Sequence, residues 1–202
     1  MTALTKPLRR LLVATLTLVA ALAVIVLPQS PASAWARIPG GCESPTTAVK
    51  WSDQTGGGNY GSPAHAAIAS WEATSTPLSF QLVGDGTHHL AVNKTNFGAD
   101  DEYAGIIYTS VGTRLPTCSG TGAPWPVKIT AFLNTAYTDG YPAQGKQSVY
   151  AHEIGHFLGL GHTGVGPCVS YPLMLSGYAT RYGSCGIYAP RSDDINGING
   201  IY

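Results

Sequence analysis

The feature that most constrains this 202-residue chain is a string of residues that runs from His152 to His162. It reads His-Glu-Ile-Gly-His-Phe-Leu-Gly-Leu-Gly-His. Residues four positions apart on an α-helix differ by about 40° in azimuth and about 6 Å in rise, so His152 and His156 would project from one face. Gly159 favours the left-handed backbone that ends a helix, and Gly161 helps the reversal that follows. The string therefore predicts a helix, an abrupt turn, and a third imidazole brought back to the first two.

The same string carries the side chains of a metal site. Three protein ligands and one open position are typical of catalytic zinc sites, and imidazole suits zinc. Glu153 follows the first histidine, where a carboxylate can accept a proton from a metal-activated water. His-Glu-x-x-His alone arises by chance in about one chain of this length in forty, and a fixed Gly159 and His162 lower that to below about one in ten thousand. We therefore expect His152, His156 and His162 to bind zinc (Zn2+) and Glu153 to act as general base.

The N-terminus has the pattern of a secretory signal peptide over residues 1–34. A basic start precedes the apolar stretch from Leu11 to Leu27, and Ala32-Ser33-Ala34 offers a small-x-small cleavage pattern. An uncleaved membrane anchor is the alternative, because about 17 apolar residues lie at the lower limit of what spans a bilayer. Pro28 and Pro31 break the helix before the cleavage pattern and favour the signal peptide. We expect a secreted, extracellular protein.

The rest of the chain, residues 35–202, has the length of a single domain. The whole chain has 11 basic and 11 acidic residues, and three of the basic ones lie in the expected signal peptide, so the mature net charge is about −3. A chain with this net charge lacks the excess of basic residues that is typical of a nucleic-acid-binding protein. We expect a monomer that binds no nucleic acid and, after signal cleavage, no membrane.

The cysteines are even in number: Cys42, Cys118, Cys168 and Cys185. In an exported chain this predicts two disulfides, although four cysteines allow three connectivities that the sequence does not distinguish. We favour Cys168 with Cys185 and Cys42 with Cys118, because the first pair closes a short loop after the histidine string. No Cys-x-x-Cys spacing occurs, which argues against a thiolate zinc site.

Apolar periodicity predicts an α+β fold. One helix is expected over residues 62–74, with Ser62 as its cap and Pro63 in its first position. A second begins near Gly145 and carries the histidine string, and a third begins at Ser192. Strands are expected over residues 48–51, 78–83, 89–92, 104–108 and 127–133, a glycine-rich turn over 54–61, and a loop rich in Pro, Gly and Ser over 112–126.

With Leu173-Met174-Leu175 placed after it, the extended string resembles the signature of the metzincin zinc endopeptidases. Within that clan the chain is most similar to a bacterial matrixin, because residues 62–83 resemble the family's first helix and strand and residues 193–202 its last helix. The resemblance implies a metzincin-like catalytic domain: a twisted, mostly parallel small sheet, an active-site helix and a C-terminal helix. It also implies a zinc-dependent endopeptidase that hydrolyses peptide bonds in protein or peptide substrates.

The resemblance implies roles for residues outside the string. Met174 would form a methionine turn beneath the metal. Substrate would bind in extended form against an edge strand that contains Ile106 and Tyr108. Tyr178 would wall the pocket for the residue after the scissile bond. Ser176 stands where matrixins usually have a proline, which is a departure at that wall.

Other departures concern further metals and control. His88-His89 and the cluster Asp100-Asp101-Glu102 resemble structural zinc and calcium sites of matrixins, but neither spacing matches. We expect ordinary solvated loops there, and calcium (Ca2+) stays open as a second cofactor. Gly40-Gly41-Cys42 lies near the mature start, where a propeptide cysteine could cap zinc, but the even cysteine count favours a disulfide.

One alternative function belongs to another class: a secreted zinc-containing binding or toxin-like module without proteolytic activity. A closed structural site would need a fourth protein ligand, and none stands near the string. A metzincin of a different family with narrow specificity is the nearer alternative. The sequence does not reveal the physiological substrate, the cleavage specificity or the control of activity.

Overall fold

The computed structural model describes residues 35–110, 118, 120–164 and 167–202. The expected signal peptide, residues 1–34, lies outside the described residues, as do residues 112–117 and 119 of the expected loop. The described residues all belong to one compact unit. Within the described ranges, no helix is long and apolar enough to cross a bilayer.

A five-stranded sheet has the order β3-β2-β4-β7-β5. The first four strands in that order are parallel to their neighbours, whereas β5 is antiparallel to β7, with Ile107 opposite Ala131. This confirms the expected mostly parallel small sheet and places β5 at one edge. The strands are β2 (Ala48–Asp53), β3 (Ser79–Leu82), β4 (Leu90–Thr95), β5 (Gly105–Thr109) and β7 (Ile129–Asn134).

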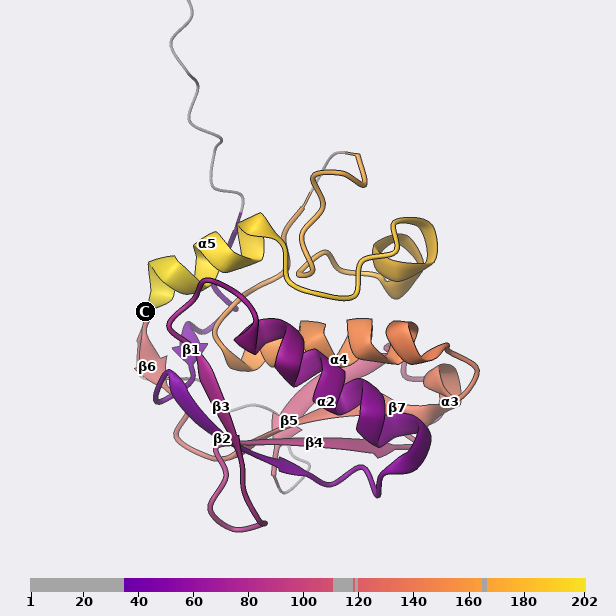
Figure 1. Ribbon diagram of the computed structural model, residues 1–202, viewed down its shortest axis with the longest axis horizontal. Helices are drawn as coiled ribbons and strands as arrows, with labels where there is room; N and C mark the ends of the chain where they lie inside the picture. The colour runs from indigo at the N-terminus through magenta and orange to yellow at the C-terminus, as the bar shows by residue number, and fades with distance from the viewer. Residues whose placement is uncertain (1–34, 111–117, 119, 165–166) are drawn as a thin grey trace, which may run out of the picture. The chain divides into compact units, whose positions relative to one another are not determined.

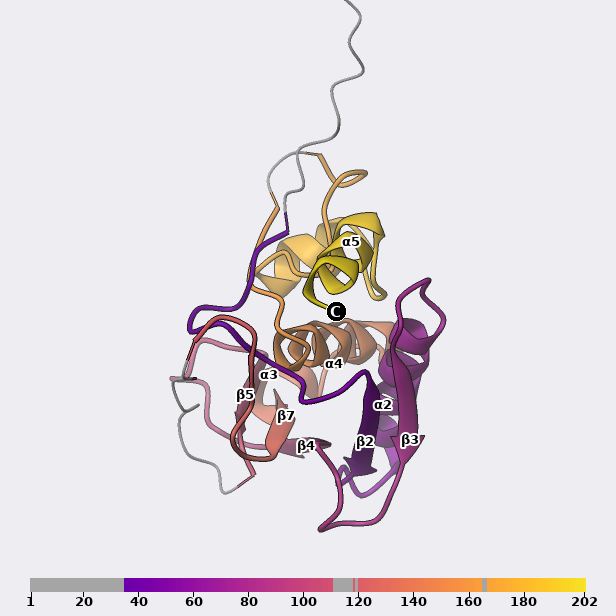
Figure 2. The ribbon, with the colours of Figure 1, turned by 90° about the vertical axis from the view of Figure 1, so that its left-hand side faces the viewer.

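Two long helices, α2 (Gly58–Glu72) and α4 (Ala143–Phe157), lie side by side on one face of the sheet (Figures 1 and 2). The indole N–H of Trp71 donates to the carbonyl oxygen of Ala151 at 2.9 Å and joins the two helices. Both residues are fully buried, as is Ile154 on α4. The core therefore lies between the helix pair and the sheet, and it fixes which face of α4 is left for a functional site.

The remaining elements are short or C-terminal. α5 (Ser192–Ile201) is the expected last helix, whereas α3 (Thr135–Thr138) and the π-helical turn η1 (Ala179–Ser184) were not predicted. A two-stranded pair of β1 (Cys42–Glu43) and β6 (Ala123–Pro124) was also not predicted. The two-residue strands carry no periodicity that could reveal them.

The start of α2 differs from the prediction. The helix begins at Gly58 rather than at Ser62, so Pro63 lies inside it and the glycine-rich turn is shorter than expected. A proline there removes one backbone hydrogen bond. Tyr60 accounts for the extra turn, because its ring is buried and its hydroxyl donates to Asp139 Oδ1 at 2.6 Å.

Two disulfides join distant parts of the unit, and they follow the pairing favoured above. Cys42–Cys118 links β1 to the segment before β6, and Cys168–Cys185 links the loop after the histidine string to the end of η1. Cys42 is therefore not a free thiol that could cap a metal.

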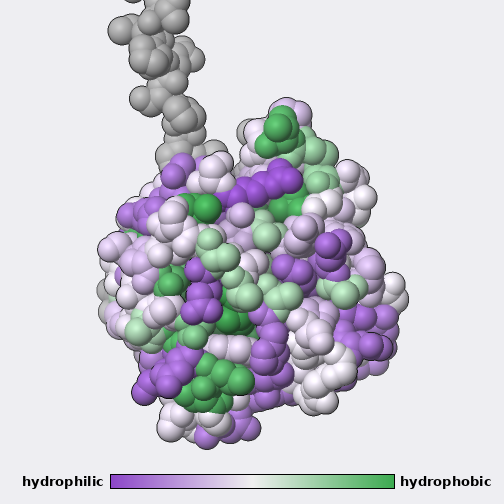
Figure 3. Space-filling view, in the orientation of Figure 1, coloured by the Kyte–Doolittle hydropathy of each residue, from purple (hydrophilic) through white to green (hydrophobic). Residues whose placement is uncertain are grey.

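Figure 3 shows apolar and polar side chains interspersed over one face of the unit.

Candidate metal centre and cavity

The turn after α4 has the backbone that its glycines predicted. The helix ends at Phe157, and Gly159 follows with a φ of 104° in the left-handed region. A side chain at Gly161 would collide with the backbone of Arg37, because the N-terminal segment crosses at this point. The N–H of Ile38 donates to Gly159 O at 2.8 Å, and the N–H of Gly161 donates to Ala36 O at 2.7 Å. An N-terminal segment thus supports the reversal that carries His162.

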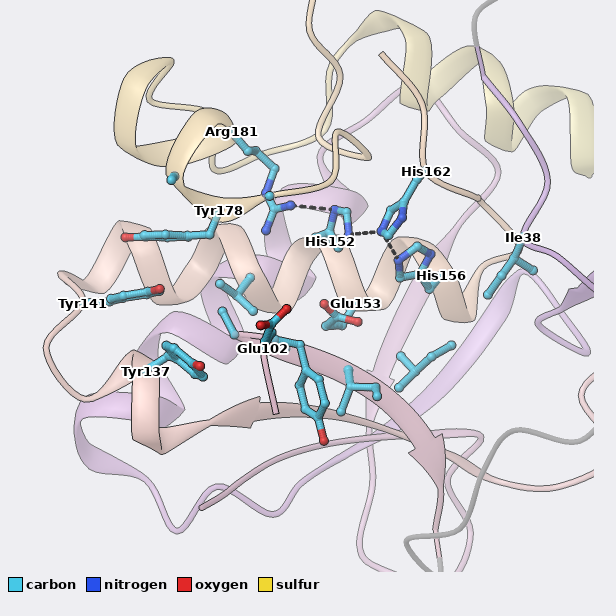
Figure 4. Close-up of a pocket in the computed structure, with 18 residues that line it drawn as sticks. Ile38, Glu102, Tyr137, Tyr141, His152, Glu153, His156, His162, Tyr178 and Arg181 are labelled. Atoms are coloured by element: carbon cyan, nitrogen blue, oxygen red, sulfur yellow. Dashed lines mark hydrogen bonds between the residues drawn. The ribbon is translucent and has the colours of Figure 1, made fainter. Parts of the chain in front are cut away.

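Three imidazoles meet at the C-terminal half of α4 (Figure 4). His162 Nε2 lies 3.0 Å from His152 Nε2 and 3.1 Å from His156 Nε2. A tetrahedral zinc with Zn–N bonds of about 2.0–2.1 Å separates its ligand nitrogens by about 3.3–3.4 Å, so the rings would need to move apart only slightly to accept the ion. Among the described residues, this is the one cluster of three histidine, cysteine or acidic residues close enough to share an ion. The triad fits a zinc ion.

Hydrogen bonds orient two of the three rings. His152 Nδ1 lies 2.9 Å from Leu173 O, and His156 Nδ1 lies 2.8 Å from Leu160 O. An Nδ1–H that donates to a carbonyl leaves the Nε2 lone pair directed at the metal position. Burial lowers the pKa of His152 well below its usual value, lowers that of His156 to about 4, and lowers that of His162. The imidazoles are therefore neutral at neutral pH, as metal ligands must be.

Glu153 lies beside the triad and lines a cavity of about 600 Å³. Its side chain is almost fully buried, and burial raises the pKa of its carboxyl to about 8, an effect that the positive charge of Arg181 opposes. A bound dication would further favour the carboxylate. The cavity thus brings together three histidines that could hold a metal and an adjacent carboxyl group.

The edge strand β5 borders the same cavity through Gly105, Ile106 and Ile107. Ile106 therefore lies where the sequence placed it. Tyr108 is not among the lining residues; its ring packs instead against Phe97, with centroids 5.7 Å apart. Strand alternation does not explain the difference, because residues two positions apart share a face. The ring of Tyr108 packs in a cluster with Phe97 and Phe132 instead.

Gly105 keeps β5 close to the carboxylate. A Cβ atom at this position would collide with Val149 and lie 2.7 Å from Glu153 Oε1. The strand can approach α4 this closely only because no side chain intervenes. Sequence reasoning missed this role, and the only available signal was a glycine at the start of an expected strand.

Met174 lies beneath the metal helix. It is buried, and a Cβ on Gly155 would collide with its sulfur. The backbone at this turn is held by Asp194 of α5, whose Oδ2 accepts from Leu173 N at 2.7 Å and whose Oδ1 accepts from Met174 N at 3.0 Å. The sequence marked Asp194 only as part of a helix start; its contact with the methionine turn was missed.

Three tyrosines close the end of the cavity away from the triad: Tyr137, Tyr141 and Tyr178 (Figure 4). The rings of Tyr141 and Tyr178 stack with centroids 3.8 Å apart and planes inclined by 10°. The Tyr178 hydroxyl lies so close to Gly145 that a Cβ there would collide with it. Tyr178 is therefore a wall of the cavity in this structure, even though Ser176 replaces the proline expected nearby.

Arg181 on η1 is a further site residue that sequence reasoning missed. Its side chain is buried, Nε donates to Ser148 Oγ at 3.1 Å, and Nη1 donates to Leu175 O at 2.7 Å. Nη1 also lies 3.0 Å from His152 Nδ1. Burial lowers the pKa of Arg181 to about 10, so the guanidinium is still charged at neutral pH. One signal was available, since Arg181 is the only Asp, Glu, Lys or Arg between His162 and Arg191.

The loops considered for other metals do not form a second site. His88 is buried, and neither of its ring nitrogens has a hydrogen-bond partner. His89 Nδ1 accepts from Lys50 N at 3.2 Å. Asp100 and Asp101 are exposed, while Glu102 lies at the mouth of the cavity. Within the described ranges these residues join no further cluster that could hold calcium or zinc.

Comparison with known proteins agrees with this geometry. Residues 126–202 match the family model Peptidase_M10, described as matrixin, and that range contains the triad, Glu153 and Met174. No curated protein matches the chain. The match does not extend to β2, β3, β4 and β5. The match to residues 126–202, which is less than half of the chain, supports a matrixin-type metallopeptidase domain.

Proposed function

We propose that this protein is a secreted zinc-dependent endopeptidase that hydrolyses peptide bonds in proteins. The observation that carries the proposal is the juxtaposition of three imidazoles with the buried carboxyl group of Glu153 on the wall of one cavity. The matrixin match to the segment that contains them supports the same reaction class. A binding module would need the triad but would have no use for the adjacent Glu153.

The roles of the residues follow from their positions. His152, His156 and His162 would hold zinc, which would supply Lewis-acid polarisation of the scissile carbonyl and lower the pKa of water. Glu153 accepts a proton from the attacking water and passes it to the leaving amine. Gly105 lets β5 lie against that carboxylate, which limits the positions open to it. Leu173 O holds the His152 ring through Nδ1.

Substrate binds along β5 in this proposal. The strand lies at the edge of the sheet and borders the cavity beside Glu153. An extended peptide can add to such an edge through backbone hydrogen bonds, while its alternate side chains enter pockets. That mode suits an endopeptidase, because it reads the middle of a chain rather than an end.

Secretion is supported by the signal-peptide pattern over residues 1–34 and by two disulfides. Disulfides persist in oxidising compartments. The proposed extracellular location is tested by sequencing the N-terminus of the protein recovered from the culture medium. Cleavage after Ala34 is the expected result, and a protein retained in the membrane with residues 1–34 attached would contradict it.

The reaction is tested with a peptide library and Glu153→Gln. The parent should cleave internal peptide bonds, lose that activity to a chelator, and regain it with zinc. E153Q should keep one zinc per chain and lose about 10²–10⁴-fold in kcat/KM, the usual contribution of a general base. Glu72→Gln, the same change on the exposed end of α2, should leave both values unchanged. An E153Q variant as active as the parent would refute the mechanism, and a zinc-loaded parent that cleaves no peptide would favour the binding module.

A further inference from the structure

The cavity contains a buried cation that the proposed mechanism does not use. Arg181 is 3% exposed and lines the cavity. Within the part of the chain that the structure describes, its guanidinium forms no ion pair with a carboxylate. Asp194 and Glu153 act on it only through space. Burying a charge without an ionic partner is costly, and buried arginines are usually paired.

The guanidinium has N–H donors that form no hydrogen bond with the described residues. Nε and Nη1 are committed to Ser148 Oγ and Leu175 O, and Nη1 also contacts His152. Nη2 makes no hydrogen bond to any described residue. Figure 4 shows the guanidinium reaching from η1 toward the space between Tyr178 and His152. The two N–H groups of Nη2 are therefore available to a group that enters the cavity.

The surrounding walls suit a side chain with an apolar stem and an anionic end. Val149 of α4 and the ring of Tyr178 offer apolar surface along the cavity. The stack of Tyr178 on Tyr141 closes the far end. A carboxylate is the natural complement of a guanidinium, because the hydrogen bonds are charge-assisted and match its planar geometry. Glu102 opposes an anion, but it is exposed at the mouth, where water screens its charge.

The segment that carries Arg181 is cross-linked to its neighbours. The disulfide Cys168–Cys185 ties the end of η1 to the preceding loop. Ser148, which accepts from Arg181 Nε, itself donates to Ile187 O at 2.7 Å. π-helical turns occur often at functional sites. A fixed cation discriminates between charged and neutral groups better than a mobile one, because little reorganisation is needed when the ligand arrives.

We propose that Arg181 makes this cavity select a substrate side chain that ends in a carboxylate. The preferred scissile bond then precedes a glutamate or aspartate, because the resemblance to matrixins implies that Tyr178 walls the pocket for the residue after that bond. This inference rests on the proposed peptidase function and names its substrate class. It makes Arg181 a specificity-determining residue rather than a catalytic one.

Three fluorogenic peptides that differ only in the residue after the scissile bond test the proposal: glutamate, glutamine and leucine. Glutamate and glutamine are nearly isosteric, so the ratio of their kcat/KM values reports the charge alone. The parent should favour glutamate over glutamine by about tenfold or more. Arg181→Gln should bring that ratio close to one, whereas Arg181→Lys should keep most of the preference. A general loss of activity lowers all three rates and leaves the ratio unchanged, so it does not mimic the expected result.

Several results would overturn the inference. One is that the parent cleaves the glutamine or leucine peptide with the same kcat/KM as the glutamate peptide. This measurement does not depend on the folding of any variant. Another is an unchanged ratio in R181Q. Binding of the peptides to zinc-loaded E153Q, followed by fluorescence anisotropy, separates this inference from the proposed function. Tighter binding of the glutamate peptide to E153Q than to the double variant E153Q/R181Q supports selectivity even if no peptide is cleaved. Equal binding to both refutes it.

Discussion

Asp194 gives the sharpest test of how the fold holds the metal centre. Its carboxylate is buried and accepts three backbone N–H donors: Leu173 N at 2.7 Å, Met174 N at 3.0 Å and Arg191 N at 2.8 Å. The first two belong to the methionine turn and the third to the start of α5. One side chain therefore joins the last helix to the turn beneath the metal helix.

Asp194→Asn keeps the shape and removes the charge. Oδ2 serves Leu173 and Arg191, whereas Oδ1 serves Met174. In its better orientation the amide oxygen replaces Oδ2, and its NH2 group then faces the N–H of Met174. One buried N–H without a partner costs about 1–3 kcal/mol, and loss of charge assistance in the other two bonds adds about 1 kcal/mol. We expect the free energy of unfolding to fall by about 3 kcal/mol.

The same change should weaken zinc binding. Leu173 donates to Asp194 through its N–H and accepts from the His152 ring through its carbonyl oxygen, at 2.7 Å and 2.9 Å. Loss of a group that orients a metal ligand typically costs about 10–100-fold in affinity. Urea denaturation of the metal-free protein, followed by circular dichroism with disulfides intact, measures the stability, and competition with a chromophoric chelator measures the zinc affinity.

Asp193→Asn is the matched control, because it removes the same charge from the same turn of α5. A charge near a helix N-terminus contributes about 0.3–1 kcal/mol, so D193N should cost less than D194N and leave zinc affinity unchanged. The reasoning would be refuted by a D194N variant within 1 kcal/mol of the parent, or by equal losses in the two variants.

Three further perturbations have expected outcomes. Gly105→Ala should lower kcat/KM by about 10–100-fold, because the added methyl group displaces Glu153 and small misplacements of a catalytic group are costly. The zinc content should stay unchanged, and loss of zinc would show that the effect is not confined to Glu153. Replacing Cys168 and Cys185 by serine should lower the free energy of unfolding by about 3 kcal/mol, as expected for a loop of 17 residues, and an unchanged thermal midpoint would refute this. Removing zinc with a chelator should lower the thermal midpoint of the parent, since a ligand at 100 times its Kd stabilises the folded state by about 2.7 kcal/mol. Equal midpoints with and without zinc would exclude a metal site in the folded state.

Much of the fold could be predicted because its signals are local. The alternation of residues 127–133 and the helical spacing before Leu160 depend on neighbours a few positions apart, and β7 and α4 formed there. Boundaries were less predictable. The start of α2 moved to Gly58 because Tyr60 reaches Thr138 and Asp139, residues that no local pattern connects to it.

By itself, the sequence determined the arrangement of the three histidines that could bind a metal. His152, His156 and His162 lie within one helix and one turn, so their convergence follows from helix geometry and from Gly159. The tertiary structure alone decided what surrounds them. Asp194 lies about 20 residues from the turn that it holds, and Arg181 lies 29 residues from His152. Contacts over such separations arise only when packed elements bring the chain together, and burial then sets the charge and reach of each group.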